Sequence, residues 1–326
     1  DNAVKCRLCN HVCNIMPGAR GKCGVRENQG GTLYSLAYGM VIALNVDPIE
    51  KKPLFHFLPG THSYSIATAG CNFTCRFCQN SDISQMPSDT GRISGRPANP
   101  EEIVLQAEAA GAASISYTYT EPTVYFEFAR DTAAIAASRG IRNVFVTNGF
   151  MTAECLDEID PHLHAANVDL KAFSDTFYRE QCGARLKPVL LTVEKMHRMG
   201  IWVEVTTLII PGLNDSDGEL REIAGFISSL DPGIPWHVSR YHPAYRLQDP
   251  PPTPAKTVRR ARQIGYEEGL HYVYTGNTAH DDGENTFCHL CKALLIERVG
   301  FHVAGSRMEK GRCPGCGAQI PGVWNG

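Results

Sequence analysis

Residues 69–80, AGCNFTCRFCQN, decide how the rest of the chain is interpreted, because they place Cys71, Cys75 and Cys78 in one short segment. Three thiolates spaced C-x3-C-x2-C can hold three irons of a cubane iron–sulfur cluster. A ferredoxin-type run supplies a fourth cysteine, but here none follows Cys78 until Cys155. The spacing therefore predicts a cluster whose fourth iron stays open for the amino and carboxylate groups of a ligand.

A zinc site completed by a distant fourth ligand is the alternative for this segment. Zinc knuckles usually contain C-x2-C pairs, and the C-x3-C-x2-C spacing fits them poorly. The segment also directly follows a predicted strand, SYSIATA (63–69). The iron–sulfur interpretation is favoured once that context is included.

Predicted strands and helices alternate from about residue 63 to residue 276. The other predicted strands are ASISYTY (113–119), NVFVTN (143–148), ANVDLKA (166–172), WVEVTTLII (202–210), WHVSRYH (236–242) and HYVYTG (271–276). Predicted helices between them include PEEIVLQAEAAG (100–111), TVYFEFARDTAAIAASRG (123–140), KPVLLTVEKMHRMG (187–200) and DGELREIAGFISSL (217–230). This alternation predicts an α/β fold with parallel strands and right-handed crossovers.

The composition is that of a globular enzyme with unusually many cysteines. Of 326 residues, 43% are hydrophobic and 20% are charged, and the net charge of −3 gives no footprint for nucleic acid or an anionic membrane. Most of the 13 cysteines fall into tight clusters that suit metals better than disulfides. We therefore expect a reducing, cytoplasmic location. Cys155 and Cys182 stand alone and are predicted to be packing residues, with a hydrogen-donating thiol as the alternative.

Two C-x2-C pairs near the C-terminus predict a closed metal site. Cys288 and Cys291 form one pair, Cys313 and Cys316 form the other, and LLIERVGFHVAG (294–305) lies between them as a predicted hairpin. Four thiolates in this arrangement are typical of a zinc ribbon or a rubredoxin-type site. Zinc is favoured because a closed four-thiolate site suits a structural role, and iron stays open as an alternative.

A second cysteine quartet, Cys6, Cys9, Cys13 and Cys23, lies near the N-terminus. Its density predicts a metal site, in which His11 could replace one cysteine. Structural zinc is slightly favoured, and an auxiliary iron–sulfur cluster is the alternative.

These clusters divide the chain into four predicted parts. They are an N-terminal four-cysteine metal-binding module (1–30), a connecting segment packed on the main domain (31–60), the βα domain (61–280) and a C-terminal module of the zinc-ribbon or rubredoxin kind (281–326).

The cysteine motif, with an aromatic residue before its last cysteine, resembles the radical S-adenosylmethionine (SAM) superfamily. Within it the chain resembles the glycyl-radical-enzyme activases and, more closely, the radical enzymes of the AmmeMemoRadiSam system. Besides the cysteine segments, the closer resemblance is carried by KKPLFHFLPG (51–60), TYTEPT (118–123), VTNGF (146–150), NVDLKAF (167–173), LIIPGLND (208–215) and RYHP (240–243). Together with six βα units and a seventh strand, it implies a partial (β/α)6-type barrel.

The resemblance also implies a reaction and its partners. An external donor of the flavodoxin or ferredoxin type would reduce a [4Fe-4S] cluster held by Cys71, Cys75 and Cys78. Bound SAM would then be cleaved to methionine and a 5′-deoxyadenosyl radical that abstracts a hydrogen atom from the substrate. The substrate would be a protein, such as a glycyl radical enzyme, or a small molecule. A metal-binding scaffold without catalysis is the non-enzymatic alternative.

Predicted cofactor-binding residues lie at successive strand ends, where a βα array places its site. By resemblance, Thr120 and Glu121 lie near the methionine ammonium group, although the activases have two glycines before this glutamate. Asn148 lies near the nucleoside, and Phe77 lies near the adenine. Val146 stands where related activases have a carboxylate that binds a monovalent cation, which puts such an ion in doubt.

The fourth and sixth strands supply the remaining predicted site residues. Asp169 and Lys171 alternate with Leu170, so both charges point to one face of the strand. By resemblance, Lys171 contacts the methionine carboxylate and Asp169 orients it; a surface ion pair is the alternative. His242 would lie near the sulfonium or the carboxylate, and a simple turn residue is the equal alternative.

Overall fold

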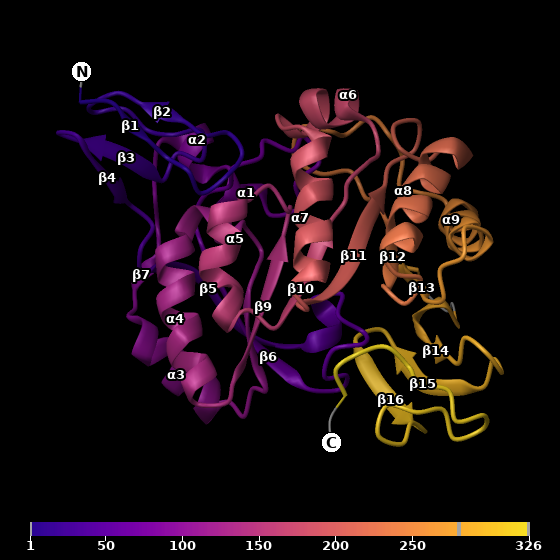
Figure 1. Ribbon diagram of the computed structural model, residues 1–326. Coiled ribbons are helices and arrows are strands. Elements are labelled where there is room, and N and C mark those ends of the chain that lie inside the picture. The colour runs from indigo at the N-terminus through magenta and orange to yellow at the C-terminus, as the bar shows by residue number, and fades with distance from the viewer. Residues whose placement is uncertain (1, 279–281, 325–326) are drawn as a thin grey trace.

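The computed structural model describes residues 2–278 and 282–324. Its centre is a sheet in the order β13-β12-β11-β10-β9-β8-β6-β5-β7 (Figure 1). Seven consecutive strands of this sheet are parallel: β6 (His62–Thr68), β8 (Ser114–Tyr117), β9 (Arg142–Thr147), β10 (Ala165–Asp169), β11 (Trp202–Ile209), β12 (Trp236–Arg240) and β13 (Val273–Gly276). β5 (Met40–Pro48) and β7 (Arg96–Pro97) add an antiparallel edge.

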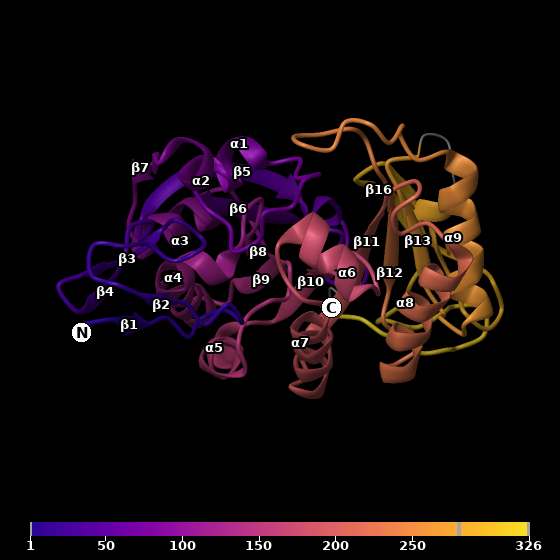
Figure 2. The same cartoon turned by 90° about the horizontal axis from the view of Figure 1, so that it is seen from above.

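Helices cover the outer face of this curved sheet, which stays open between its two edges (Figure 2). They are α3 (Pro100–Ala109), α4 (Phe126–Ser138), α5 (Ala153–Ile159), α7 (Leu186–Arg198), α8 (Asp217–Leu230) and α9 (Ala255–Glu267). Shorter turns of helix are α1 (Ser81–Ser84), α2 (Met86–Thr90), α6 (Asp175–Phe177), η1 (Ile49–Lys51), η2 (Pro122–Tyr125), η3 (Asp160–His162), η4 (Tyr178–Cys182) and η5 (Asp282–Glu284). The predicted α/β partial barrel is confirmed, and each predicted strand overlaps an observed one.

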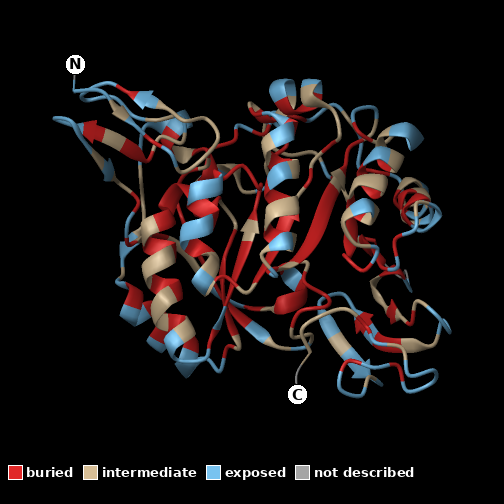
Figure 3. Ribbon diagram, in the orientation of Figure 1, coloured by how far each residue is buried: buried red, intermediate tan, exposed pale blue. Residues whose placement is uncertain are grey.

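Local sequence explains where several helices begin. Asn99 and Glu102 form a capping box at α3, in which Asn99 Oδ1 accepts from the Glu102 amide at 2.9 Å. The Thr152 and Ser216 side chains also accept a hydrogen bond from the backbone amide three residues further on, and they cap α5 and α8. The central strands are buried on both faces (Figure 3), as strands covered by helices on one side and by a filled barrel interior on the other must be.

Two small modules lie at opposite ends of the parallel strands (Figure 1). The N-terminal one lies at the carboxyl ends and contains the pairs β1 (Val4–Lys5) with β2 (Asn14–Ile15) and β3 (Arg26–Gln29) with β4 (Thr32–Ser35). The last pair crosses the predicted boundary at residue 30. The C-terminal module contains β14 (Thr286–Phe287), β15 (Leu294–Val299) and β16 (His302–Ser306), so the hairpin predicted over 294–305 is confirmed.

Residues 49–60 close the amino end of the barrel. Ile49, Leu54 and Phe57 are buried and form a cluster with residues from the starts of β9 and β10. The buried Glu204 carboxylate of β11 accepts hydrogen bonds from the backbone amides of Phe55 at 3.0 Å and His56 at 2.7 Å. This anchored plug leaves the carboxyl end of the barrel for a site. Among the described residues, no helix combines the length and apolarity needed to cross a bilayer.

Candidate active site

The three-cysteine loop follows β6 at the carboxyl end of the barrel. Gly70 opens the loop with φ +103°, and a Cβ atom there would lie 2.7 Å from Val25 and 3.1 Å from the Cys23 carbonyl oxygen. Only glycine therefore allows both this turn and the close approach of the N-terminal module. The loop is further fixed by an amide bond from Thr74 to the Cys182 carbonyl oxygen at 2.9 Å.

The loop and the neighbouring strand ends line one cavity of about 410 Å³. All but one of the residues that the sequence predicts for the cluster and SAM line this cavity: Cys71, Cys75, Phe77, Cys78, Thr120, Glu121, Asn148, Asp169 and Lys171. They come from the loop after β6 and from the ends of β8, β9 and β10. The parallel topology thus brings together residues from four separate segments of the chain.

The Glu121 carboxylate is buried and supports the end of β9. It accepts hydrogen bonds from the Thr147 hydroxyl at 2.8 Å and from the Asn148 amide at 2.8 Å, and from the Thr123 amide at 3.1 Å. Burial raises the pKa of this carboxyl above its ordinary value. Glu121 therefore borders the cavity while its oxygens hold the backbone that carries Asn148.

Asn148 connects the end of β9 to the cysteine loop. Its Nδ2 donates to Asn72 Oδ1 at 2.7 Å and lies 3.8 Å from the Cys71 sulfur. Asn148 is thus placed to fix the first cysteine of the loop.

Lys171 and Asp169 form an ion pair on the cavity wall. The Lys171 ammonium lies 3.0 Å from an Asp169 oxygen and 5.8 Å from the centre of the Phe77 ring. Burial opposes the lysine charge, but Asp169 and the Cys75 thiol together hold the pKa of Lys171 well above its ordinary value. Lys171 therefore stays positively charged on the cavity wall, where it can bind a carboxylate.

The three thiols have the chemistry that a cluster with an open iron requires. Burial raises the pKa of the Cys71 and Cys78 thiols, so a metal is needed to hold them as thiolates at neutral pH. Cys182 is fully buried beside Cys75, but it is not among the residues that line the cavity. Three thiols face the cavity with open space beyond them, so the residues fit the predicted cluster.

His242 does not join the site. It is exposed and is absent from the cavity wall. After β12 ends at Arg240, the side chain of Tyr241 turns inward and its hydroxyl donates to the Leu247 carbonyl oxygen at 2.7 Å. The side chain of His242 therefore points to solvent, away from the residues predicted to bind SAM.

The sequence interpretation missed a further polar group that lines the cavity. Lys51, Lys52 and Tyr119 line it, and Asp47 binds Lys51 at 2.8 Å, Lys52 at 2.6 Å and the Tyr119 hydroxyl. Burial lowers the pKa of Lys52 to about 8. Tyr119 has φ +62°, a strained value for a bulky residue and one often found at sites. The two lysines that begin KKPLFHFLPG were the available signal in the sequence.

The C-terminal quartet forms a compact thiol cluster. All four sulfur atoms of Cys288, Cys291, Cys313 and Cys316 lie within 4.8 Å of one another, with Cys288–Cys316 at 3.6 Å and Cys291–Cys313 at 3.5 Å. Four thiolates around one zinc ion would lie about 3.8 Å apart, from Zn–S bonds of about 2.3 Å. This quartet is therefore able to bind a single metal ion.

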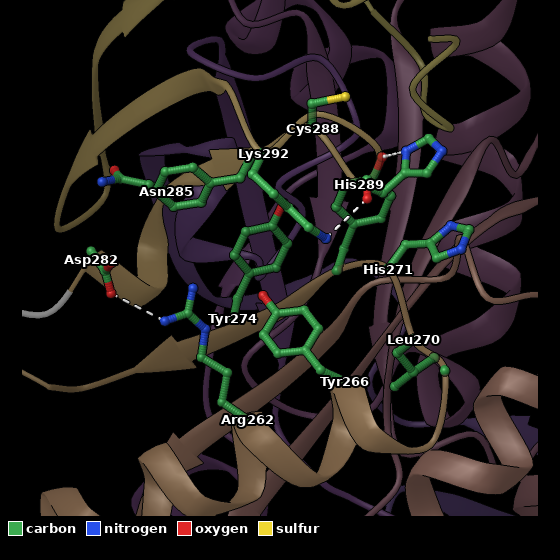
Figure 4. A pocket seen from close by; sticks show the side chains of 13 residues that line it. Arg262, Tyr266, Leu270, His271, Tyr274, Asp282, Asn285, Cys288, His289 and Lys292 are labelled. Atoms are coloured by element: carbon green, nitrogen blue, oxygen red, sulfur yellow. Dashed lines mark hydrogen bonds and ion pairs between the residues drawn. The ribbon is translucent and has the colours of Figure 1, made fainter.

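Another cavity, of about 540 Å³, lies where α9 and β13 meet the C-terminal module (Figure 4). Arg262 pairs with Asp282 at 3.1 Å on its wall, and the His271 and His289 rings stack at 4.6 Å. The cavity contains no residue of the three-cysteine loop. Its position beside Cys288 makes it part of the seam between barrel and module, remote from the candidate site.

Comparison with known proteins points to one family. The family model described as the Radical SAM superfamily matches residues 65–227. The uncharacterized protein MJ0808 of Methanocaldococcus jannaschii is 48% identical over 323 residues, covering 98% of this chain and 96% of that one. A pyruvate formate-lyase-activating enzyme of Streptococcus mutans is 22% identical over 219 residues, covering 61% and 82%. The structure of Streptococcus suis SuiB bound to S-adenosylmethionine is similar in fold, with a TM-score of 0.53 and 15% identity over 74% of this chain and 56% of that one.

Proposed function

Because the chain belongs to the radical SAM superfamily, we propose that it reductively cleaves SAM at a [4Fe-4S] cluster and abstracts a hydrogen atom from a substrate. One observation carries this proposal: three thiols of a single loop and the polar ends of three parallel strands line the same cavity. When bound, the cluster and SAM would supply the one-electron cleavage of the sulfonium and the 5′-deoxyadenosyl radical.

The protein's own residues would bind and orient the two groups. Cys71, Cys75 and Cys78 would hold three irons of the cluster. Lys171, kept charged by Asp169, would bind the methionine carboxylate. Asn148 would fix the nucleoside end while it remains anchored to the loop through Asn72.

An adjoining cavity of about 570 Å³ provides space for the substrate. It shares with the first cavity the residues Lys51, Gln79, Thr206, Ser239 and Asn277. Four buried oxygens on its wall have no hydrogen-bond partner among the described residues: Glu50 Oε2 and the hydroxyls of Thr206, Thr275 and Thr278. Since unpaired buried polar atoms are costly and hydroxyls both donate and accept, they favour a polar substrate group that can form hydrogen bonds.

We propose a polypeptide as the substrate that brings such a group into the cavity. The relatives include a putative glycyl-radical enzyme activating enzyme of M. jannaschii, which is 24% identical over 181 residues. The alternative is a small molecule, and the volume of the second cavity supports it because that volume is typical of small-molecule sites. Reduction would come from an external one-electron donor of the flavodoxin or ferredoxin type, and the cytoplasm is the proposed location.

The decisive experiment separates catalysis from mere cluster binding. The chain is reconstituted anaerobically with iron and sulfide, reduced, mixed with SAM and assayed for 5′-deoxyadenosine. Cys75→Ala should lose the product, whereas Cys155→Ala, at a buried cysteine outside the cavity, should keep it. Absence of product from the wild-type chain with a reduced cluster would favour the scaffold alternative.

For the C-terminal quartet we propose structural zinc. The short sulfur separations and the closed set of four thiols support one ion with no open position. Metal analysis of the purified chain should find one zinc per chain that Cys313→Ser removes. Retention of that zinc in the variant would place it elsewhere.

A further inference from the structure

We propose that the N-terminal quartet, Cys6, Cys9, Cys13 and Cys23, binds a second iron–sulfur cluster directly beside the three-cysteine loop. The sequence left this quartet open between zinc and iron–sulfur. Its sulfur spacing, its scaffold and its contacts with the loop together favour the cluster. The presence of this cluster does not depend on the proposed SAM chemistry, whereas its role as an electron relay rests on that proposed function.

The spacing of the quartet differs from that of a single-ion site. Among the described residues, the C-terminal thiols all lie within 4.8 Å of one another, whereas no three thiols of the N-terminal quartet meet that spacing. The cysteines of the loop at residues 71–78 do not meet it either. In a [4Fe-4S] cluster each thiolate binds its own iron, so the sulfurs stand further apart than around one zinc ion. Among the described residues, the N-terminal quartet thus lacks the tight packing of the C-terminal thiols, as the loop also does.

Hydrogen bonds and packing nevertheless order the backbone around the N-terminal quartet. The Cys6 amide donates to the Cys13 carbonyl oxygen at 2.9 Å, which closes the segment between the first and third cysteines. Cys13 Sγ lies beside Gly21, where a Cβ atom would be 3.7 Å from the sulfur, so the turn before Cys23 packs against the third cysteine. All four thiols are free in the structure. The backbone that carries the first, third and fourth cysteines is therefore ordered by these contacts.

Asn72 joins this quartet to the loop that holds the other cluster. His11 Nε2 lies 2.8 Å from the Asn72 carbonyl oxygen, and the Asn72 side chain interacts with the Cys9 thiol. Asn72 Oδ1 accepts from Asn148 and lies 3.8 Å from the Cys71 sulfur. One amide side chain therefore touches a cysteine of each set.

The Nδ2 group of the Asn72 side chain indicates that a ligand binds here. Asn72 is 3% exposed, and its Nδ2 makes no hydrogen bond of normal geometry to a described residue, although the Cys9 thiol lies close to this amide. A buried N–H donor without an acceptor costs free energy. A cluster-bound thiolate at Cys9 is an acceptor, and such N–H bonds to sulfur tune the potential of iron–sulfur clusters.

Backbone contacts fasten the N-terminal module to the loop that follows β9. Cys9 pairs with Met151 in an isolated β-bridge, and the Asn10 amide donates to the Phe150 carbonyl oxygen at 2.9 Å. The Thr152 hydroxyl donates to the Arg7 carbonyl oxygen at 2.6 Å. The second cluster would accept one electron from the external donor protein and pass that same electron to the loop cluster, with no bond made or broken.

The test uses the full chain and reads metal content and spectra. A Cys71→Ala/Cys75→Ala/Cys78→Ala variant, reconstituted anaerobically, should retain iron and sulfide in equal amounts and show one paramagnetic reduced cluster. Adding Cys9→Ser and Cys13→Ser should remove that signal, and Cys155→Ala in the triple variant, at a buried cysteine outside both sets, should leave it unchanged. In the wild-type chain the two reduced clusters should broaden or split each other's resonance lines. A triple variant that holds no iron and carries a second zinc ion would overturn the proposal.

Asn72→Leu supplies an independent readout. In the triple variant background it should lower the reduction potential of the remaining cluster, because the thiolate loses an N–H donor. Gln85→Leu, which changes another buried amide bound to the loop at Phe73, is the matched control and should leave that potential unchanged. Equal potentials for Asn72→Leu and its parent would refute the contact.

Discussion

The substitution Glu121→Gln tests whether the buried carboxylate holds the end of β9 for SAM. The two oxygens of Glu121 accept from the backbone amides of Thr123 at 3.1 Å and Asn148 at 2.8 Å and from two hydroxyls. Glutamine replaces one oxygen by an NH2 group. Whichever way the amide turns, the NH2 faces a backbone N–H, so one donor is left without its acceptor.

The size of the effect follows from that lost bond. A hydrogen bond to a charged group contributes about 1.5–3 kcal/mol, and each 1.4 kcal/mol corresponds to about tenfold in an equilibrium constant. If the donor that loses its acceptor is the backbone amide of Asn148, the position of Asn148 relative to Asn72 and Cys71 changes. The dissociation constant for SAM should then rise roughly 10- to 150-fold.

Equilibrium binding of SAM to the reconstituted chain measures this effect, and 5′-deoxyadenosine formation at saturating SAM follows the chemistry. The exposed Glu154→Gln is the matched control and should bind SAM like the wild type. The cluster content must be equal in all three proteins. A dissociation constant for Glu121→Gln within twofold of wild type would refute the positioning role.

Three further outcomes are expected. Burial lowers the pKa of His56 from 6.5 to about 4, so its folded state resists a proton that the unfolded state accepts. The free energy of unfolding that depends on this group is complete above pH 6.5 and falls by about 3 kcal/mol as the pH falls towards 4. In denaturant unfolding, His56→Gln should therefore lose less stability in acid than the wild type does. An equal pH dependence of the two proteins would contradict this. Thr275→Val removes a buried hydroxyl that has no hydrogen-bond partner among the described residues. It should raise the free energy of unfolding by about 1 kcal/mol while weakening substrate turnover, and a lower melting temperature would count against an empty hydrogen-bonding site. Zinc removal from the C-terminal quartet, or Cys313→Ser, should make residues 286–320 sensitive to proteolysis first, and uniform cleavage across the chain would argue against a structural ion.

Periodicity and strand ends predicted most of the fold and the edge at which the candidate site lies, whereas the roles of most site residues came from the resemblance to the radical SAM superfamily. Parallel strands place their carboxyl ends at one edge, so the Asp169 and Lys171 pair and Asn148 could be expected beside the cysteine loop. The loop itself follows β6, as its position after SYSIATA predicts. These inferences needed no knowledge of distances between segments.

What the sequence could not predict depends on the path of the backbone between elements. The exposure of His242 results from the inward turn of Tyr241 towards Leu247, six residues later. The Asp47, Lys52 and Tyr119 group combines an edge strand, the plug and a residue in a left-handed conformation. No periodic pattern links these three segments, since Tyr119 is distant in the sequence from Asp47 and Lys52 and contacts Asp47 only in the folded chain.

The positions of the two cysteine modules argue for different roles. The C-terminal module lies at the amino end of the strands, where Arg298 donates to the Phe55 carbonyl oxygen at 2.8 Å and the Val323 amide donates to that of His56 at 2.7 Å. These contacts fasten the plug and lie away from the three-cysteine loop. The N-terminal module instead touches the loop through Asn72 and Gly70. Loss of metal at the C-terminal end should therefore cost stability, whereas loss at the N-terminal end should change the redox properties of the site.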